Sequence, residues 1–442
     1  MSTTHASEDL NKTLASKDSS ATQHEEQISE VSVRSVLALA GSALAYFCTV
    51  GFMNAYGVFQ QYYTAHYLPT YSNFQISWIG SVATFVLFAC APAAGLLADK
   101  YGPSLPILIG SILEIIAIFM VSLCRRYYQF FLAQAVLLGV GMSFIAIATS
   151  TIVPLYFKRN RALAQGISIG GSSLGGILWP IALDQMLNKD DVSFGWTMRI
   201  IGFVMIPLLV MVLIFVRKPA VPTSTTVDTV ENASEPEKKN AEETTPKKTI
   251  PSTLKQPPFI LLCLGLAIAY LGFFAPIFYI SVYATSLGFS EGFAFYLISI
   301  LNGASLFGRI LPGFIADRYG HFNILVLASV SSGLVVFCWT TATSIPGLVI
   351  WTIAYGFTSG AILSLQLACA TGLTSEKERG KAIGVAMGSV SLTGLFGTPV
   401  AGELVERGDG SLAGFAGAML VGGGLLLGCA RLGKSRELWA RV

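Results

Sequence analysis

One eight-residue motif occurs twice in this chain, once in each half of the sequence. Residues 95–102 read GLLADKYG and residues 313–320 read GFIADRYG. We call the shift that places Gly95 on Gly313 the repeat offset. The same offset places the arginine and the glycines of residues 161–170 on those of residues 379–388. Since one shift aligns two separate motifs, we infer that the chain consists of two homologous halves arranged head to tail.

Each half also contains six long apolar segments. Of the residues, 53% are hydrophobic and only 12% are charged, whereas a soluble protein carries about 25% charged residues. A membrane-spanning helix needs about 20 apolar residues, and a helix pairs all its backbone amides internally. The sequence therefore predicts an all-α membrane protein with twelve transmembrane helices in two pseudo-symmetric six-helix bundles, a symmetry typical of secondary transporters. The predicted spans are 35–59, 76–98, 105–123, 129–156, 162–186, 197–216, 258–286, 293–316, 322–341, 345–369, 381–403 and 411–431.

Positive charge is distributed unevenly along the chain. With both termini cytoplasmic, 22 of the 28 Lys and Arg residues fall in cytoplasmic tails and loops. This bias follows the positive-inside rule, so we expect both termini in the cytoplasm. The predicted parts are a disordered N-terminal tail at 1–33, a bundle at 34–216, a cytoplasmic linker at 217–256, a second bundle at 257–431 and a C-terminal tail at 432–442.

The repeated motif, G-x-[LI]-A-D-[KR]-x-G, resembles the signature loop of the major facilitator superfamily, which implies the fold of that family. Small glycines would let two helices approach closely, and each aspartate could accept hydrogen bonds from the amide end of a neighbouring helix. The alternative for either copy is a plain helix stop followed by a turn. The resemblance implies a latch that holds the cytoplasmic side closed. We assign the gating role to Asp99, Asp317, Gly95, Gly313, Arg161 and Arg379.

Residues 156–176, YFKRNRALAQGISIGGSSLGG, resemble the monocarboxylate-porter branch of that superfamily, and residues 51–63, GFMNAYGVFQQYY, resemble its fungal members. Fungal members of the branch export specialised metabolites or take up carboxylates or vitamins. Classical proton–lactate symporters carry a lysine where this chain has Asn54, and an aspartate where it has Ser305. These differences favour export over proton–lactate symport.

Arg309 is the leading candidate for a substrate-binding residue. A cation in the middle of a span is costly, so it should face the protein interior or a watery cavity. Asn302 and Ser305 precede it by seven and four positions, and we expect the three residues to form one polar stripe. A guanidinium suits a carboxylate or another anion. The alternative is that Arg309 caps carbonyl groups near the cytoplasmic end and extends its head group to the surface.

Other polar residues in the spans are weaker candidates. Cavity positions are predicted for Asn54, Tyr279, Tyr283 and Gln366, since aromatic groups with polar tips suit an amphipathic organic ligand. Ordinary helix packing is the alternative for each of them. Glu114, midway along the third segment, is a candidate proton site, and the alternative is a neutral carboxyl group hydrogen-bonded to a neighbouring helix.

These observations predict a secondary active transporter that moves a small organic anion or specialised metabolite across the cell membrane by alternating access. The leading interpretation is a fungal efflux pump. The alternatives are proton-coupled uptake of a monocarboxylate or of a vitamin such as riboflavin, and a nutrient receptor that does not transport. We expect a monomer in the lipid bilayer, with protons as a candidate coupling ion. The sequence has no motif for an enzyme, a cofactor, a metal or nucleic acid.

Overall fold

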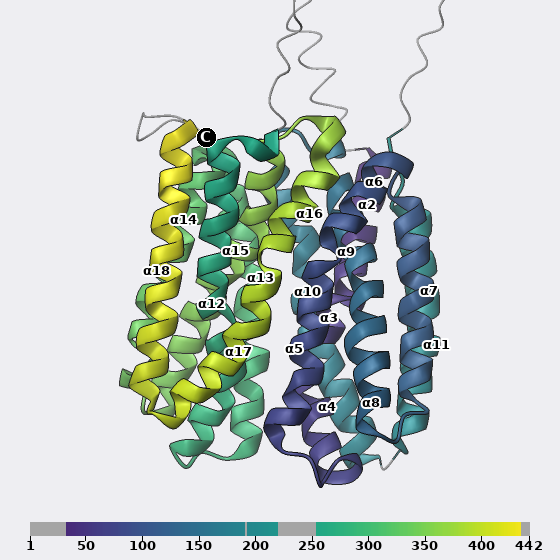
Figure 1. Ribbon diagram of the computed structural model, residues 1–442, viewed down its shortest axis with the longest axis vertical. Coiled ribbons are helices and arrows are strands. Elements are labelled where there is room, and N and C mark those ends of the chain that lie inside the picture. Colours follow the sequence, from purple (N-terminus) through teal and green to yellow (C-terminus); the bar gives the residue numbers. More distant parts are fainter. Residues whose placement is uncertain (1–31, 191, 220–252, 435–442) are drawn as a thin grey trace, which may run out of the picture.

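Two bundles of helices stand side by side in the structure, a computed structural model that describes residues 32–190, 192–219 and 253–434 (Figure 1). The described residues form helices and no strands. Within these described ranges, eleven helices are long and apolar enough to cross a membrane, and the shorter apolar helix His321–Phe337 lies at the predicted ninth span. The predicted all-α fold is therefore confirmed. Most of the predicted N-terminal tail, most of the linker and most of the C-terminal tail lie outside the described residues.

The N-terminal bundle is built from helices that follow one another closely, and several spans are broken by a bend or a π-helical turn. The second span breaks at Cys90, just before Pro92, whose ring cannot continue the hydrogen-bonding pattern of the preceding turn. Its elements are α2 (Val33–Cys48), α3 (Val50–Met53), α4 (Tyr56–Tyr62), η1 (Tyr63–Tyr67), α5 (Asn73–Ala89), α6 (Ala91–Tyr101), α7 (Ser104–Val121), α8 (Tyr127–Phe130), η2 (Phe131–Leu137), α9 (Leu138–Tyr156), α10 (Arg161–Asp184), η3 (Gln185–Lys189) and α11 (Phe194–Phe215).

The C-terminal bundle repeats this order with fewer interruptions. Its eleventh span breaks at Val390, between α16 and α17. The last helix continues to Lys434, slightly beyond the predicted boundary. The elements are η4 (Thr253–Lys255), α12 (Pro257–Ser286), α13 (Glu291–Tyr319), α14 (His321–Phe337), η5 (Trp339–Thr341), α15 (Ile345–Gly372), η6 (Glu376–Glu378), α16 (Arg379–Ser389), α17 (Ser391–Glu406) and α18 (Asp409–Lys434).

The last glycine of each repeated motif ends a helix. Gly102 and Gly320 have φ angles of +85° and +98°, a left-handed region that side chains with a Cβ rarely occupy. Both stand directly after the helix that carries the motif, and each donates its N–H to a carbonyl of the last turn. The motif therefore contains its own helix stop.

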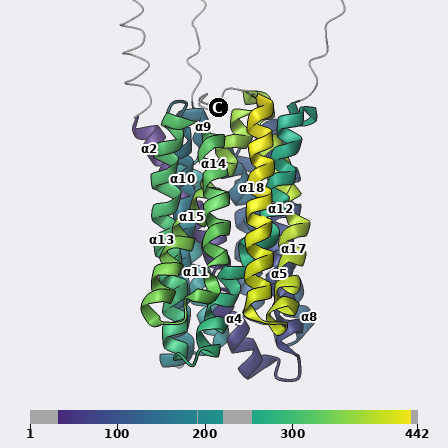
Figure 2. The same ribbon diagram turned by 90° about the vertical axis from the view of Figure 1, so that its left-hand side faces the viewer.

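Apolar side chains cover the outside of the molecule. Ile112 on α7, Phe203 on α11, Leu327 on α14 and Leu425 on α18 are between 49% and 63% exposed. These four helices lie at the outer sides of the two bundles (Figures 1 and 2). An apolar surface of this extent fits a lipid environment rather than water.

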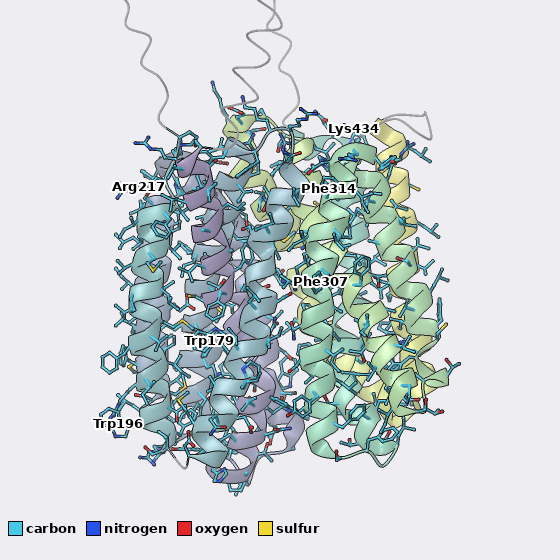
Figure 3. All side chains as sticks on the ribbon, turned by 180° about the vertical axis from the view of Figure 1, so that it is seen from behind. Trp179, Trp196, Arg217, Phe307, Phe314 and Lys434 are labelled. Atoms are coloured by element: carbon cyan, nitrogen blue, oxygen red, sulfur yellow. The ribbon has the colours of Figure 1, made fainter. Side chains whose placement is uncertain are left out.

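The described chain ends gather at one end of the molecule, which we call the termini end. Figure 3 shows Arg217, just after the sixth span, and Lys434, at the end of α18, near this end, whereas Trp196 lies near the opposite one. The hydrophobic core of the C-terminal bundle extends across the boundary to Tyr46, Ala94 and Ile169 of the other bundle. The bundles are therefore in direct contact.

Candidate functional site

The aspartate of the first motif caps a helix of the other bundle. Asp99, in the last turns of α6, accepts hydrogen bonds from the backbone N–H groups of Gly380 (2.8 Å) and Lys381 (2.7 Å) at the start of α16. The first amides of a helix have no partner within it, and the helix dipole favours a negative charge there. This contact joins the two bundles at the termini end.

The second aspartate makes the equivalent contact in the opposite direction. Asp317 on α13 accepts hydrogen bonds from the N–H groups of Ala162 and Leu163, both at 2.9 Å, at the start of α10. The repeat offset aligns the two caps residue by residue: Asp99 matches Asp317, and Ala162 and Leu163 match Gly380 and Lys381. The two caps differ in one contact. Nε2 of His321 lies 3.0 Å from Oδ1 of Asp317, whereas Asp99 has no such neighbour because the position that matches His321 is Pro103.

Glycines of the motifs allow these helices to touch. A Cβ atom added at Gly95 would collide with the carbonyl oxygen of Gly380. A Cβ atom added at Gly313 would lie 2.7 Å from the carbonyl oxygen of Ala162, closer than real Cβ atoms approach. Both positions therefore require glycine in this arrangement of the bundles.

A second pair of glycines lies on the capped helices, α10 and α16, and each of them packs against the helix that carries the capping aspartate. Gly166 on α10 lies against the backbone carbonyl of Arg309 on α13. Gly384 on α16 lies against that of Ala91 on α6, where an added Cβ would be 2.5 Å from the oxygen. The repeat offset relates these two contacts as well, so the glycine contacts at the termini end are duplicated together with the caps.

Arg161 and Arg379 lie at the starts of the two capped helices. Arg161 interacts electrostatically with Asp317 and Glu376, and Arg379 with Asp99 and Glu376. Nη2 of the buried Arg379 is 3.6 Å from Oε1 of Glu376. Each aspartate cap is thus accompanied by a cation from the helix that it caps. The gating role of these residues stays a prediction.

Arg309 connects the bundles deeper in the interface. Its Nη1 donates hydrogen bonds to the carbonyl oxygen of Ile169 (2.7 Å) and to Oγ of Ser172 (2.5 Å), both on α10. No carboxylate of the described residues forms an ion pair with it, and its Nε has no hydrogen-bond partner there. Since the residue is only 3% exposed, it does not extend to the surface. That part of the alternative interpretation is wrong.

Two tyrosines that the sequence analysis did not single out interact electrostatically with Arg309. The hydroxyl of Tyr46 lies 2.6 Å from Oγ of Ser150, and the hydroxyl of Tyr270 accepts a hydrogen bond from Nε2 of Gln366 at 2.8 Å. The two tyrosines occupy the same position counted from the start of their helices, α2 and α12, and each partner lies on the fourth span of the same bundle. The sequence does not give this register, because it depends on where the two helices begin.

Asn54 and Asn302 approach each other beside α10. Nδ2 of Asn54 donates to the carbonyl oxygen of Ser172 at 3.5 Å. A Cβ added at Gly176 would lie 2.7 Å from Oδ1 of Asn302 and 3.0 Å from Nδ2 of Asn54. The structure therefore brings these two candidates and Arg309 together along one helix.

Ser305 lies near another helix, α15, and its place in the predicted polar stripe stays a prediction. A Cβ added at Gly360 of α15 would lie 2.9 Å from its Oγ, which places Ser305 inside the C-terminal bundle. At about 100° per residue, the seven positions between Asn302 and Arg309 return to within about 20° of the same direction. Ser305 differs by about 60° from Asn302 and by about 40° from Arg309, so it stands toward one side of this face.

Tyr279 and Tyr283 lie farther along α12, away from Tyr270. Tyr283 packs edge-to-face on Trp339, with ring centroids 5.7 Å apart. The hydroxyl of Tyr279 would lie 2.8 Å from a Cβ added at Gly402 on α17. Tyr279 is nine residues beyond Tyr270, or about 13 Å along the helix. The structure therefore does not bring these two candidates to the group around Arg309.

Glu114 is buried in the N-terminal bundle, where α7 packs on α9. Neither of its carboxyl oxygens has a hydrogen-bond partner in the described part of the chain, so the alternative of a hydrogen bond to a neighbouring helix is wrong. Cys48 on α2 is within electrostatic range. The candidate proton site is thus separate from the Arg309 group, and its role stays a prediction.

Comparisons with known proteins agree on one family. The family model described as Major Facilitator Superfamily matches residues 38–356. A protein named as an MFS-type transporter from Aspergillus fumigatus is 46% identical over 415 residues, which cover 92% of this chain and 94% of that protein. The agnestins efflux protein of Paecilomyces divaricatus is 46% identical over 404 residues, covering 91% and 88%.

A third relative and a solved structure extend this comparison. The aspyridones efflux protein of Emericella nidulans is 35% identical over 396 residues, covering 89% of this chain and 77% of that protein. The solved proton:xylose symporter XylE matches with a TM-score of 0.69 at 13% identity, covering 88% of this chain and 94% of the other. At this identity the likeness concerns the fold alone.

Proposed function

The chain belongs to the major facilitator superfamily, and on that premise we propose that it is an efflux transporter for a specialised metabolite that is an organic anion. Two relatives are named as efflux proteins, for agnestins and for aspyridones. Both align with most of this chain, so the proposal transfers export of a specialised metabolite, but neither compound, to it.

The observation that carries the proposal is the environment of Arg309. The guanidinium remains charged at any physiological pH, and it is buried between the bundles with one nitrogen unpartnered among the described residues. Its two hydrogen bonds both go to the opposite bundle, so separation of the bundles at this level would break them. An anion entering the opened interface would then meet a cation that has just lost its partners.

Alternating access follows from the duplicated contacts at the termini end. In our proposal, the two aspartate caps hold this end closed, and their release lets the bundles rock apart. Energy comes from an ion or solute gradient, with protons as the candidate ion. We further propose that the protein is a monomer in the cell membrane and belongs to the monocarboxylate-porter-like branch. Its termini end faces the cytoplasm, and it transports its cargo without catalysing a reaction on it.

The test compares metabolites in the culture medium and in the cells of the source organism. Deletion of the gene should raise the cell-to-medium ratio of one acidic metabolite. Complementation with Arg309→Ala or Arg309→Lys, at membrane levels matched by immunoblot, should not restore the ratio. Arg407→Ala is the matched control, because Arg407 is exposed and pairs with the nearby Glu403. If deletion changes no ratio, export is refuted. If Arg309→Ala restores the ratio fully, the anion-binding role is refuted.

A further inference from the structure

The polar groups around Arg309 form one connected set, which we call the interface cluster. It comprises Tyr46, Ser150, Gln165, Tyr270, Arg309 and Gln366, and all six are buried. Ser150 links the N-terminal part, since its hydroxyl lies 2.6 Å from Tyr46 and its carbonyl accepts a hydrogen bond from Nε2 of Gln165 at 3.0 Å. Tyr46 and Tyr270 interact electrostatically with Arg309 and with each other.

Several hydrogen-bonding atoms of the interface cluster have no partner among the described residues. They are Nε of Arg309, Oε1 of Gln165 and Oε1 of Gln366. Leaving one buried polar atom unsatisfied costs about 1–3 kcal/mol, and native proteins contain few such atoms. Three of them lie in one cluster between the two bundles, and in the proposed cycle these are the groups that a ligand satisfies.

The cluster offers both donors and acceptors, whichever way its amides are oriented. Nε2 of Gln165 faces the carbonyl of Ser150, which can only accept, so Oε1 of Gln165 is a fixed unused acceptor. Gln366 and Tyr270 share one hydrogen bond, and either amide orientation leaves this pair with an unused donor and an unused acceptor. Nε of Arg309 is a further donor.

The duplicated latch does not explain these groups. The repeat offset places Arg309 on Ala91 and Gln165 on Ile383. Helices α6 and α16 make the equivalent contact with these two apolar residues in place of the polar pair. Helix packing between the bundles therefore requires neither the guanidinium nor the amide.

Aromatic rings border the interface cluster. The ring of Phe88 on α5 lies 6.0 Å from that of Tyr270, and the ring of Phe274 lies 5.7 Å from it. Both rings are half-buried, and a Cβ added at Gly394 on α17 would lie 3.9 Å from each. Edge and face contacts with such rings favour a flat aromatic ligand.

We propose that the cargo is a hydroxylated aromatic acid. Its acidic group accepts hydrogen bonds from Arg309 and from the Tyr270–Gln366 pair, and a hydroxyl group donates to Gln165 or Gln366. A simple carboxylate lacks a donor and would leave Oε1 of Gln165 unsatisfied. This assignment rests on the proposed export of an organic anion and specifies its chemical class.

The test measures binding of three probes to the purified full-length chain in lipid nanodiscs by calorimetry. The probes are 3,5-dihydroxybenzoate, benzoate, which lacks the hydroxyl groups, and resorcinol, which lacks the acid. We expect dihydroxybenzoate to bind up to about tenfold tighter than benzoate, since one neutral hydrogen bond contributes up to about tenfold. It should bind more than about tenfold tighter than resorcinol, since hydrogen bonds to a charged group contribute more.

Variants identify the responsible groups. Gln165→Leu should reduce the preference for dihydroxybenzoate over benzoate to below threefold while benzoate affinity is kept. Gln366→Leu should also reduce this preference, and it should weaken both acids, because Gln366 belongs to the pair that binds the acidic group. Tyr270→Phe, which preserves the ring, should weaken both acids. Gln134→Leu is the control, because Gln134 is also buried and bonded to a tyrosine hydroxyl, that of Tyr63, at 2.6 Å.

Three results would overturn the cargo class: equal affinities for dihydroxybenzoate and benzoate, no binding of any probe, or a preference that both glutamine variants retain. None of them refutes export itself. That proposal fails only if deletion of the gene leaves every cell-to-medium ratio unchanged, so the two failures are distinguishable.

Discussion

Removal of the aspartate caps should open the termini end of the protein. The perturbation is Asp99→Ala, Asp317→Ala and the double variant. Each aspartate accepts two backbone N–H bonds of 2.7–2.9 Å from the opposite bundle. After substitution, the four amides lose their partners as long as the bundles stay together, whereas water can reach them once the bundles separate.

The size of the effect follows from known helix caps. Replacing a capping aspartate by alanine costs about 0.5–2 kcal/mol, and a carboxylate in a partly buried position at a helix N-terminus contributes up to about 2 kcal/mol. At about 1–2 kcal/mol, each single variant should lower the closed-to-open ratio about 5- to 30-fold. If the bundles move as rigid bodies, both caps break together, and the double variant should lower the ratio by about the product of the two factors.

Pulsed spin-label distance measurements can detect this shift. One label pair at Ser104 and Ser375, both exposed near the termini end, reports on separation of the bundles there. A second pair at Tyr128 and Thr343 reports on the opposite end. The seven native cysteines must first be replaced. We expect the double variant to gain a longer distance in the first pair and a shorter one in the second.

The matched control is Glu403→Ala, which removes an exposed carboxylate paired 3.0 Å from Arg407 in the same bundle. It should leave both distance distributions as in the unsubstituted protein. An unchanged distribution in the double aspartate variant would refute the argument that the caps hold the bundles together. A large effect of Asp99→Ala with none of Asp317→Ala would refute their equivalence.

Two further predictions concern packing and burial. Gly384→Leu should open the termini end in the same distance measurement, because even a Cβ at this position would lie 2.5 Å from the carbonyl oxygen of Ala91. Gly410→Leu is the control and should leave the distances unchanged, since no atom lies within 4 Å of a Cβ added there. Glu114→Gln should change the melting temperature of the purified protein by less than about 4 °C, as expected if the buried carboxyl is already neutral. A large stabilisation would show instead that Glu114 is ionised.

The sequence predicted the fold because its strongest signals are local or periodic. Twelve apolar segments and a motif repeated at a fixed offset determine the spans and the duplication. The helix stops at Gly102 and Gly320 are also local features. The partners of Asp99 and Asp317 could not be identified in this way, since they depend on how the two bundles cross.

The candidate site was harder to predict for a related reason. In an apolar span, an isolated polar residue gives no indication of the helix that it faces. Tyr46, Ser150 and Gln165 were missed on this account. The first helices of the two bundles are also separated by slightly more than the repeat offset, which concealed the equivalence of Tyr46 and Tyr270.

The contrast between duplicated and unique residues explains how cargo could drive the cycle. The caps and glycines are duplicated, so in our proposal they set the energy of closure without regard to cargo. Arg309 is unique, yet it lies on α13, which also carries the duplicated Asp317 and packs on α10. Its carbonyl contacts Gly166 of α10, and its guanidinium donates hydrogen bonds to Ile169 and Ser172 of the same helix. Any movement that separates α10 from α13 therefore removes the partners of a buried cation. A ligand shifts a conformational equilibrium only by binding one state more tightly, and an anion that replaces these lost bonds satisfies that condition.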